Sequence, residues 1–315
     1  MTKIFIDGSE GTTGLLLRDR LKDRPELTLV PIDPEKRKDI SARRAAMAEA
    51  DLVFLCLPDA AAKESAEAAN GLSCRILDTS TAHRTLSGWS YGFPELSKEH
   101  RKGVEEGARI AVPGCHASGF ISLVYPLIAA GLMPKDYPVT CHSVTGYTGG
   151  GKKMIADYEG ENRDKALDSP RQYGLTQSHK HLKEMQAITG LSFAPQFSPI
   201  VADFPRGMVV TVPLFSKLLK GNPTKQQIHE LLSAHYEGQA FVRVLSLDGE
   251  EEGIGGLFEA NAMEGRNSME ILVTGNDERP LLLSRFDNLG KGASGAAMQC
   301  MNIMLGVPED TGLLL

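Results

Sequence analysis

Short apolar runs alternate with longer, partly polar segments along the first 80 residues of the chain. The runs are rich in Ile, Leu, Val and Phe, as in buried strands, and comprise residues 3–7, 27–32, 52–57 and 75–78. The segments between them read as helices and comprise residues 12–22, 41–50 and 60–69. We expect Pro31 to end the second strand early or to mark an edge strand, and Ser41 to cap the second helix. Repeated strand–helix–strand units of this size predict a doubly wound parallel sheet of the α/β class, a Rossmann-type fold.

The pattern changes after about residue 115, where extended runs dominate. These runs comprise residues 139–144, 208–215, 241–247, 269–274 and 281–286. The helical segments among them comprise residues 117–130, 225–236 and 293–305. Strand-rich sequence with few crossovers predicts an antiparallel or mixed sheet, and hence a second domain of α+β type.

Composition limits the class of protein. The chain has 315 residues, of which 42% are hydrophobic and 23% charged, as in soluble globular proteins. Its formal net charge is -6 and it has no long basic run, so nucleic acid is not the expected partner. The longest apolar stretch, residues 120–133, is interrupted by Ser122, Pro126 and Gly131, and is too short to span a bilayer.

The five cysteines are odd in number, widely spaced and without a Cys-x-x-Cys pair. This pattern favours reduced thiols over a disulfide framework. The first residues are strand-like and lack the apolar core of a signal peptide. We therefore expect a cytoplasmic protein.

Gly8, Gly11 and Gly14 follow the first predicted strand, and Thr12 and Thr13 open the helix after it. Glycines permit a tight turn and the close approach of a phosphate, which a helix N-terminus attracts. The spacing differs by one residue from the usual dinucleotide fingerprint, and a plain turn could use the same glycines. The strand–turn–helix context favours nucleotide binding.

The residues after the second strand leave the choice of nucleotide open. Asp33 could bond the adenosine ribose of NAD, whereas Lys36, Arg37 and Lys38 could bind the 2′-phosphate of NADP. An ordinary charged loop would have the same composition.

Cys115 lies between a short predicted strand and a helix. A thiol at a helix N-terminus has a lowered pKa, because the positive end of the helix dipole favours the thiolate. The other four cysteines lie in apolar segments and are interpreted as small core residues. The residues alone also permit a buried, unreactive Cys115.

A nucleophilic thiol needs an acid–base partner, and His179 and His181 are candidates. On a helix, residues two apart point in different directions, whereas in an extended segment both could reach one site. Arg84 and Arg206 are isolated arginines beside loops, where either could bind an anionic substrate. A metal site would combine Cys115 and His116 with Cys141 and His142. We expect none, because these residues do not form a close ligand pair with a convincing partner pair.

Taken together, these segments resemble the N-acetyl-γ-glutamyl-phosphate reductase family of arginine biosynthesis, in its shorter form, over almost the whole chain. The matching motifs are residues 8–14, Asp78-Thr79-Ser80, His83-Arg84, residues 91–96, Val112-Pro113-Gly114-Cys115, residues 178–181, Pro205-Arg206-Gly207 and residues 286–295. The Pro-Gly-Cys and Asp-Asn-Leu-x-Lys-Gly-Ala motifs are specific in combination. The chain departs from the family in having Leu182-Lys183-Glu184 after His-x-His, and His116-Ala117 where Tyr-Pro is common.

The resemblance implies a two-domain dehydrogenase of the glyceraldehyde-phosphate and aspartate-semialdehyde type. Residues 1–114, completed by a returning C-terminal segment at 289–315, would bind NADP(H). Residues 115–288 would form the catalytic, substrate-binding and oligomerisation domain. A homo-oligomer, dimer or tetramer, is expected.

The resemblance also implies roles for individual residues. Cys115 would attack the acyl phosphate and form a thioester, which NADPH would reduce to N-acetylglutamate semialdehyde. His181 would act as the acid–base residue, and His179 would contact the substrate.

Arg84 and Arg206 would hold the carboxylate or phosphate of the substrate, and Asn288 would lie near the nicotinamide. Two alternatives stay open. One is an enzyme like aspartate-semialdehyde dehydrogenase, and the other is a catalytically silent NADP-binding regulator.

Overall fold

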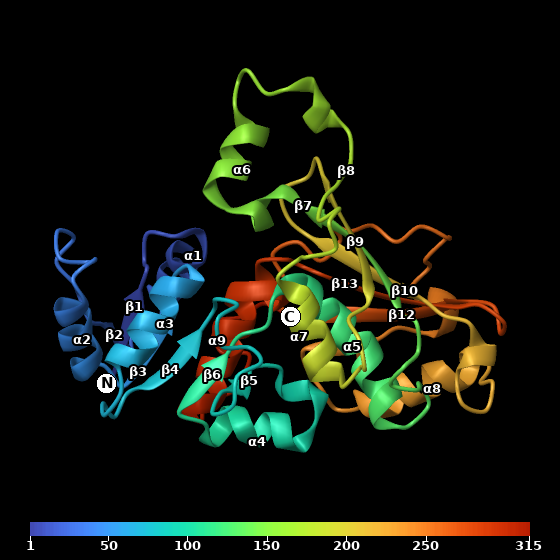
Figure 1. Cartoon of the computed structure of the whole chain (residues 1–315), viewed down its shortest axis with the longest axis horizontal. Helices are drawn as coiled ribbons and strands as arrows, with labels where there is room; N and C mark the ends of the chain where they lie inside the picture. Colours follow the sequence, from blue (N-terminus) through green and yellow to red (C-terminus); the bar gives the residue numbers. More distant parts are fainter. The chain divides into compact units, whose positions relative to one another are not determined.

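The chain divides into two compact units, coloured along the sequence in Figure 1. The structure is a computed structural model that describes all 315 residues. The first unit comprises Met1–Gly114 and Ala293–Leu313, and the second comprises Cys115–Gly292 and Leu314–Leu315. Each unit has its own sheet.

The first unit contains a six-stranded sheet in the order β2-β1-β3-β4-β6-β5, in which every neighbouring pair is parallel. Its strands are β1 (Thr2–Asp7), β2 (Leu27–Leu29), β3 (Leu52–Leu55), β4 (Arg75–Asp78), β5 (Ser90–Tyr91) and β6 (Arg109–Ala111). The predicted doubly wound parallel sheet is confirmed. The second strand ends at Leu29, earlier than the apolar run that predicted it, and Pro31 follows without a backbone donor.

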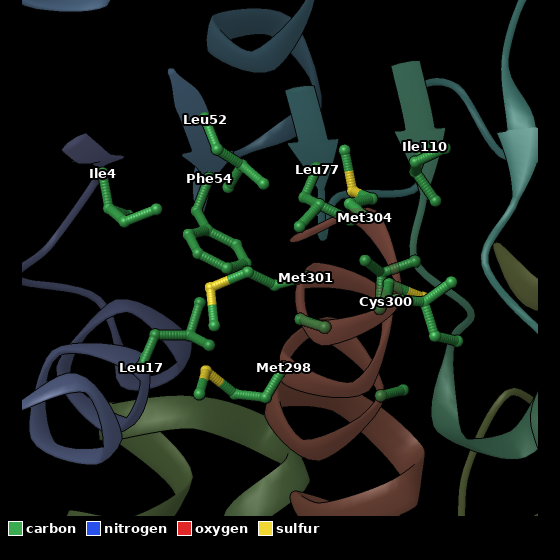
Figure 2. Packing of buried hydrophobic residues seen from close by; sticks show 14 of the residues in the cluster. Ile4, Leu17, Leu52, Phe54, Leu77, Ile110, Met298, Cys300, Met301 and Met304 are labelled. Carbon is green, nitrogen blue, oxygen red and sulfur yellow. The ribbon is translucent and has the colours of Figure 1, made fainter. Parts of the chain in front are cut away.

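Helices cover both faces of this sheet. They are α1 (Thr12–Leu21), α2 (Ile40–Glu49), α3 (Asp59–Ala68), α4 (Lys98–Glu106) and α9 (Gly295–Leu305). Alternate strand residues face opposite ways, so Ile4 and Phe54 pack with α1, α4 and α9, whereas Phe5 and Val53 pack with α2 and α3. Figure 2 shows the first of these cores, in which Met298 and Met301 of α9 meet the strand side chains.

Two arginines bind the C-terminal segment to the rest of the first unit. Arg75 donates to the Met304 carbonyl at the end of α9 at 2.8 Å, and to carbonyls at the end of α4. Arg24 donates to Asn302 at 3.0 Å and to the Thr311 carbonyl at 3.2 Å. The last carbonyls of a helix lack donors within the helix, and the guanidinium group of Arg75 supplies these donors.

The predicted cap of the second helix is wrong. The helix begins one residue earlier, at Ile40, and the capping residue is Asp39, whose carboxylate accepts from the Ser41 backbone N–H at 2.9 Å. Asp and Ser are both good capping residues, so residue type alone does not show whether Asp39 or Ser41 caps the helix.

The second unit contains a mixed seven-stranded sheet in the order β11-β12-β13-β10-β7-β9-β8. Its strands are β7 (Thr140–Gly146), β8 (Arg171–Gln172), β9 (Gln196–Ala202), β10 (Met208–Pro213), β11 (Val242–Val244), β12 (Met269–Gly275) and β13 (Pro280–Phe286). The central pairs are antiparallel, while β7–β9 and β11–β12 are parallel. The predicted α+β class is confirmed. The pattern missed β9, which contains Pro199.

The helices of the second unit are α5 (Cys115–Ala129), α6 (Gly151–Glu159), α7 (His181–Thr189) and α8 (Lys225–His235). Helix α5 packs on β10 and β13, with α7 and α8 against it (Figure 1). Helix α6 and the segment leading to β8 project from one end of the sheet (Figure 1).

Helix α5 continues through a proline because a distant side chain replaces the missing hydrogen bond. Pro126 has no N–H to donate to the carbonyl of Ser122, four residues before it. The Tyr236 hydroxyl, which follows α8, donates to that carbonyl at 2.8 Å. A buried carbonyl is therefore satisfied by tertiary structure. None of the helices has both the length and the apolar character needed to cross a membrane.

Replacing Tyr236 by Phe should lower the free energy of unfolding by about 1–3 kcal/mol, because the Ser122 carbonyl loses its donor inside the core. Urea unfolding of the wild type and Y236F measures this loss. In a Pro126→Ala background residue 126 regains an N–H, so Y236F should cost clearly less there. Equal costs in the two backgrounds would contradict the explanation.

Candidate active site

The glycine segment lies at the switch point of the first sheet. The strand order reverses between β1, whose other neighbour is β2, and β3, whose other neighbour is β4, so the chain leaves the carboxyl ends of β1 and β3 in opposite directions. Gly8 follows β1 with φ of +89°, and a side chain there would collide with the Cys56 carbonyl after β3. A side chain at Gly14 would collide with the Gly8 carbonyl. These two glycines are required by close packing at the edge where nucleotides bind in such sheets.

The N-terminus of α1 is open. Gly11 is its capping residue and makes no side-chain hydrogen bond to the helix, and the first turn holds no acidic residue. Thr12 and Thr13 are the first two helical residues. The unpaired N–H groups of a first turn and the helix dipole both attract a phosphate. The residues present therefore fit a dinucleotide.

A buried ion pair fixes the end of β1 beside this loop. The Asp7 carboxylate accepts from Arg43 at 2.9 Å and from the Ser65 hydroxyl. Burial raises the pKa of Asp7, although Ser65 and Arg43 act in the opposite direction. The pair joins α2 and α3 to the residue that precedes Gly8.

The segment after β2 is exposed. The chain forms a tight turn at Asp33. The Asp33 side chain accepts from the Glu35 N–H at 3.0 Å, and the Asp33 carbonyl accepts from the Lys36 N–H at 2.9 Å. Arg37 and Lys38 follow, both exposed. One carboxylate oxygen of Asp33 is thus engaged locally, and the basic side chains extend into solvent.

Arg84 is buried in the first unit and supports the backbone. Its Nε donates to the Val112 carbonyl at 2.8 Å and its Nη2 to the Thr79 carbonyl at 3.1 Å. His83 beside it lies 2.6 Å from Asp78 and stacks on Trp89. The arginine thus braces the strand end that leads to Cys115.

Cys115 is the first residue of α5 and is partly exposed. Burial disfavours the thiolate of three other cysteines, because it raises the pKa of Cys56 to about 12 and also raises the pKa of Cys74 and Cys141. Cys300 is buried in the core of the first unit, where its thiol contacts the Gly92 carbonyl. Of the five cysteines, Cys115 alone combines exposure with a helix N-terminus.

A glycine-rich turn lies against this cysteine. Residues Gly290–Ser294 form a single π-helical turn before α9. A Cβ at Gly292 would lie 2.9 Å from the Cβ of Cys115, which is closer than side chains pack. Glycine is therefore required beside the sulfur.

Asn288, just before this turn, is held by its amide group. Its Oδ1 accepts from the Gly207 N–H at 2.8 Å, and its Nδ2 donates to the Thr148 hydroxyl at 3.1 Å. Thr148 in turn donates to the Pro205 carbonyl at 2.6 Å. The network joins the ends of β7, β10 and β13.

Arg206 forms an ion pair with Asp287 at 2.6 Å. The Asp287 carboxylate is fully buried and also accepts from the N–H groups of Gly265, Leu289 and Gly290. Arg206 keeps a quarter of its side chain exposed, and its Nε has no partner. Because that Nε is buried, an anion could contact this side chain only at its exposed atoms.

The two candidate histidines lie side by side at the start of α7. Their ring centroids are 4.8 Å apart, because His179 precedes the helix and His181 begins it. Burial lowers the pKa of His179 to about 4, and the Lys180 charge adds to this effect. The His181 backbone N–H donates to His179 Nδ1 at 3.2 Å, which leaves the proton of the neutral ring on Nε2.

A third histidine, His116, joins them; from the sequence it is a weak metal-ligand candidate and a departure from the family, not a predicted site residue. The His116 ring lies 5.6 Å from that of His181 and 5.7 Å from that of His179. Tyr173 and Phe197 complete the aromatic cluster. The only signal in the sequence was that His116 follows Cys115; Tyr173 gave none.

Glu184 is a further buried polar residue here, one turn of α7 after His181. Cys115, His179, His181 and Asn288 all belong to the second unit, and the two histidine rings pack on that of His116, the neighbour of Cys115 in the chain. The glycine segment and Arg84 belong to the first unit.

Comparison with known proteins agrees with this arrangement. Residues 18–104 match the family model described as the NAD binding domain of semialdehyde dehydrogenase, and residues 115–288 match that of its dimerisation domain. Among solved structures, aspartate semialdehyde dehydrogenase II from Vibrio cholerae has a TM-score of 0.70 at 14% identity, covering 97% of this chain and 98% of that chain. The aspartate semialdehyde dehydrogenase from Candida albicans with NADP has a TM-score of 0.62 at 16% identity, over 97% and 98%. Fold and site define a two-domain dehydrogenase of the semialdehyde type.

Curated relatives identify the family within this class. N-acetyl-gamma-glutamyl-phosphate reductase 2 from a Nostoc species is 43% identical, covering 99% of this chain and of the relative. The N-acetyl-gamma-glutamyl-phosphate reductase from Brucella ovis is 46% identical, covering 96% of this chain and 99% of the relative. The chain belongs to the N-acetyl-γ-glutamyl-phosphate reductase family.

Proposed function

We propose that this protein reduces N-acetyl-γ-glutamyl phosphate to N-acetylglutamate semialdehyde and phosphate in arginine biosynthesis, with NADPH as reductant and Cys115 as nucleophile. The observation that carries the mechanism is a partly exposed cysteine at the N-terminus of a buried helix, beside a cluster of histidines. The near full-length similarity to reductases of that name supports the substrate.

The Cys115 thiolate attacks the acyl carbon of the substrate. A carbon–sulfur bond forms, the bond from carbon to the phosphate oxygen breaks, and phosphate leaves with its electron pair. Reduction of the resulting thioester then breaks the carbon–sulfur bond and releases the semialdehyde as the thiolate re-forms. A covalent intermediate splits one difficult displacement into two easier steps.

The two histidines have different roles in this proposal. Because its Nδ1 is occupied and its ring is neutral, His179 offers only an Nε2–H, which suits donation to a substrate oxygen. His181 is the acid–base residue, which accepts the thiol proton and donates to the carbonyl oxygen. The division follows from the state in which His179 is held.

The arginines bind the anionic groups of the substrate. Arg206 offers guanidinium donors beyond its bond to Asp287, and a planar guanidinium suits a carboxylate or phosphate. Arg84 is proposed as the second arginine, although its Nε and one Nη already support the backbone. We assign Arg206 the larger share of the binding.

Gly8, Gly11, Thr12, Thr13 and Gly14 hold the pyrophosphate of the cofactor in this proposal. Two observations support the assignment. The backbone packs too closely at Gly8 and Gly14 to admit a side chain, and the first turn of α1 has no side-chain cap. Bound NADPH supplies a hydride.

Asn288 is a proposed contact to the nicotinamide. Each end of its amide makes one hydrogen bond within the protein and can make another. We propose that copies of this chain associate through residues 115–288, as the name of the matching dimerisation domain suggests, and that the protein functions in the cytoplasm with its five cysteines as free thiols.

The assay that tests the function is the reverse reaction with N-acetylglutamate semialdehyde, phosphate and NADP, followed by absorbance of the reduced cofactor. We expect phosphate-dependent turnover. Aspartate semialdehyde in place of the acetylated substrate separates the reductase from its structural relatives, and faster turnover of that aldehyde would overturn the proposed substrate. No turnover of either aldehyde would favour a regulator.

Cys115→Ser should abolish turnover while cofactor binding stays near normal, because an alcohol is far less acidic than a thiol and the glycine segment is untouched. The measurement is kcat together with cofactor Kd by fluorescence titration. Cys74→Ser is the matched control and should keep full activity. A fully active C115S enzyme would rule out the thioester.

His181→Ala should lower kcat by roughly 10²–10⁴-fold, the usual contribution of acid–base catalysis. His179→Ala should mainly raise KM, because it removes a donor to the substrate. Steady-state kinetics of the two variants decide the assignment. Loss of kcat confined to the His179 variant would reverse the two roles.

The protein should prefer NADP(H) to NAD(H), because Lys36, Arg37 and Lys38 extend into solvent where a 2′-phosphate would be expected, and Asp33 turns back on its own loop. Replacing Arg37 and Lys38 together by Gln should raise KM for NADPH with little change for NADH. Comparing kcat/KM for both cofactors measures the preference. Equal or better use of NADH by the wild type would contradict it.

A further inference from the structure

Arg206 lies in a turn that is bonded to the end of a neighbouring strand. The turn comprises residues 203–207 and connects β9 to β10. The backbone N–H groups of residues 146–148, at the end of β7 and just after it, donate to the carbonyls of Gly207, Phe204 and Pro205, in that order, at 3.0–3.2 Å. A Cβ at Gly146 would lie 2.6 Å from the Pro205 carbonyl oxygen, so only glycine permits this approach. The backbone on both sides of Arg206 is therefore fixed to β7.

Two buried side chains bind the same turn. The Thr148 hydroxyl donates to the Pro205 carbonyl at 2.6 Å. The Asn288 amide accepts from the Gly207 N–H at 2.8 Å through Oδ1, and donates to Thr148 at 3.1 Å through Nδ2. Thr148 and Asn288 are both buried, so these hydrogen bonds compensate for the loss of water.

The direction of each of these hydrogen bonds is determined by the groups involved. The Pro205 carbonyl can only accept, so the Thr148 hydroxyl uses its one hydrogen there and can only accept from Asn288. The Gly207 N–H can only donate, so it must face the amide oxygen of Asn288. Both constraints select the same orientation of the amide. Without the Thr148 hydroxyl, Nδ2 would lose its partner and this orientation would be held at one end only.

The side chain of Arg206 is held by the residue next to Asn288. Its Nη2 lies 2.6 Å from the carboxylate of Asp287. That carboxylate is fully buried and accepts from three backbone N–H groups, so it cannot follow a movement of the arginine. Asp287 thus holds the guanidinium group of Arg206. Asn288 holds the N–H of Gly207, the residue after Arg206.

We propose that Thr148 and Asn288 are positioning residues for Arg206. Thr148 fixes the backbone before the arginine and the orientation of the Asn288 amide, which fixes the backbone after it. A side chain that is held in its binding orientation loses less conformational entropy when the anion binds. The inference rests on the proposed contact of Arg206 with an anionic group of the substrate. It gives Asn288 a role in substrate binding beside its proposed contact to the nicotinamide.

The experiment is steady-state kinetics of the reverse reaction, with N-acetylglutamate semialdehyde and phosphate varied separately. Arg206→Gln identifies the anion, because it should raise KM for one of these two substrates. Thr148→Val keeps the branched shape of the side chain and removes the hydroxyl. We expect it to raise the same KM by about 3- to 10-fold, the effect of releasing one long side chain from its binding orientation.

A double-mutant cycle separates positioning from packing. In an Arg206→Gln background, Thr148→Val should cause no further rise in this KM, because Thr148 acts through that arginine. Thr148→Ser retains a hydroxyl and should restore most of the wild-type value. Thr140→Val, at the other end of β7, is the matched control and should change neither KM.

Further variants keep the test decisive if one of these does not fold, which thermal unfolding identifies. Asn288→Ala removes the amide itself and should raise the same KM as Thr148→Val. Arg206→Lys keeps a positive charge opposite Asp287 and replaces Arg206→Gln in the cycle. Fluorescence titration of NADPH with each variant reports binding of the cofactor separately.

The results distinguish this inference from the proposed function. If Arg206→Gln raises one KM while Thr148→Val and Asn288→Ala do not, the positioning role is wrong and substrate binding by Arg206 stands. An equal rise caused by Thr148→Val in both backgrounds, or a change confined to the Kd for NADPH, would also overturn the positioning role. If both KM values stay unchanged in Arg206→Gln, the proposed substrate contact fails, and this inference fails with it.

Discussion

A buried helix determines where the sulfur of Cys115 lies. Helix α5 is buried along most of its length, packs on β10 and β13, and begins at Cys115 itself. The thiol therefore has no flexible segment between it and the core, and its backbone position is set by packing rather than by loop conformation. The missing bond at Pro126 is replaced by Tyr236, and the glycine turn at residue 292 leaves room beside the sulfur.

The same constraint explains the state of the surrounding polar groups. Histidines packed among Phe197, Tyr173 and one another lose hydration, which disfavours the charged imidazolium and keeps His116 and His179 neutral. The backbone N–H of His181 fixes the tautomer of His179, because it occupies the Nδ1 lone pair of that neutral ring. The cluster can thus present a fixed donor to a substrate, at the cost of burying polar groups that must all be satisfied.

The glycine segment of the first unit is suited to binding an anion without a charged side chain. The backbone at Gly8 lies against the Cys56 carbonyl, and the backbone at Gly14 lies against the Gly8 carbonyl. The first turn of α1 has no side-chain cap, so its N–H groups are available. The buried Asp7–Arg43 pair holds the preceding strand end. Side-chain charge enters only at the exposed basic residues after Asp33, which is where discrimination between cofactors is proposed.

Local signals in the sequence determined the parallel sheet, the glycine turn between β1 and α1, and the position of Cys115 near the start of a helix. Each depends on residues close together in the chain, so that apolar periodicity and the properties of glycine suffice. Tertiary structure decided the rest. Strand β9 forms despite Pro199 because it pairs with β7 and β8, and Asn288 finds Gly207 and Thr148 only after the second sheet assembles. His116 lies within hydrogen-bond distance of Ser143 and Tyr173, which are 27 and 57 residues away along the chain, and their meeting depends on packing that no local pattern records.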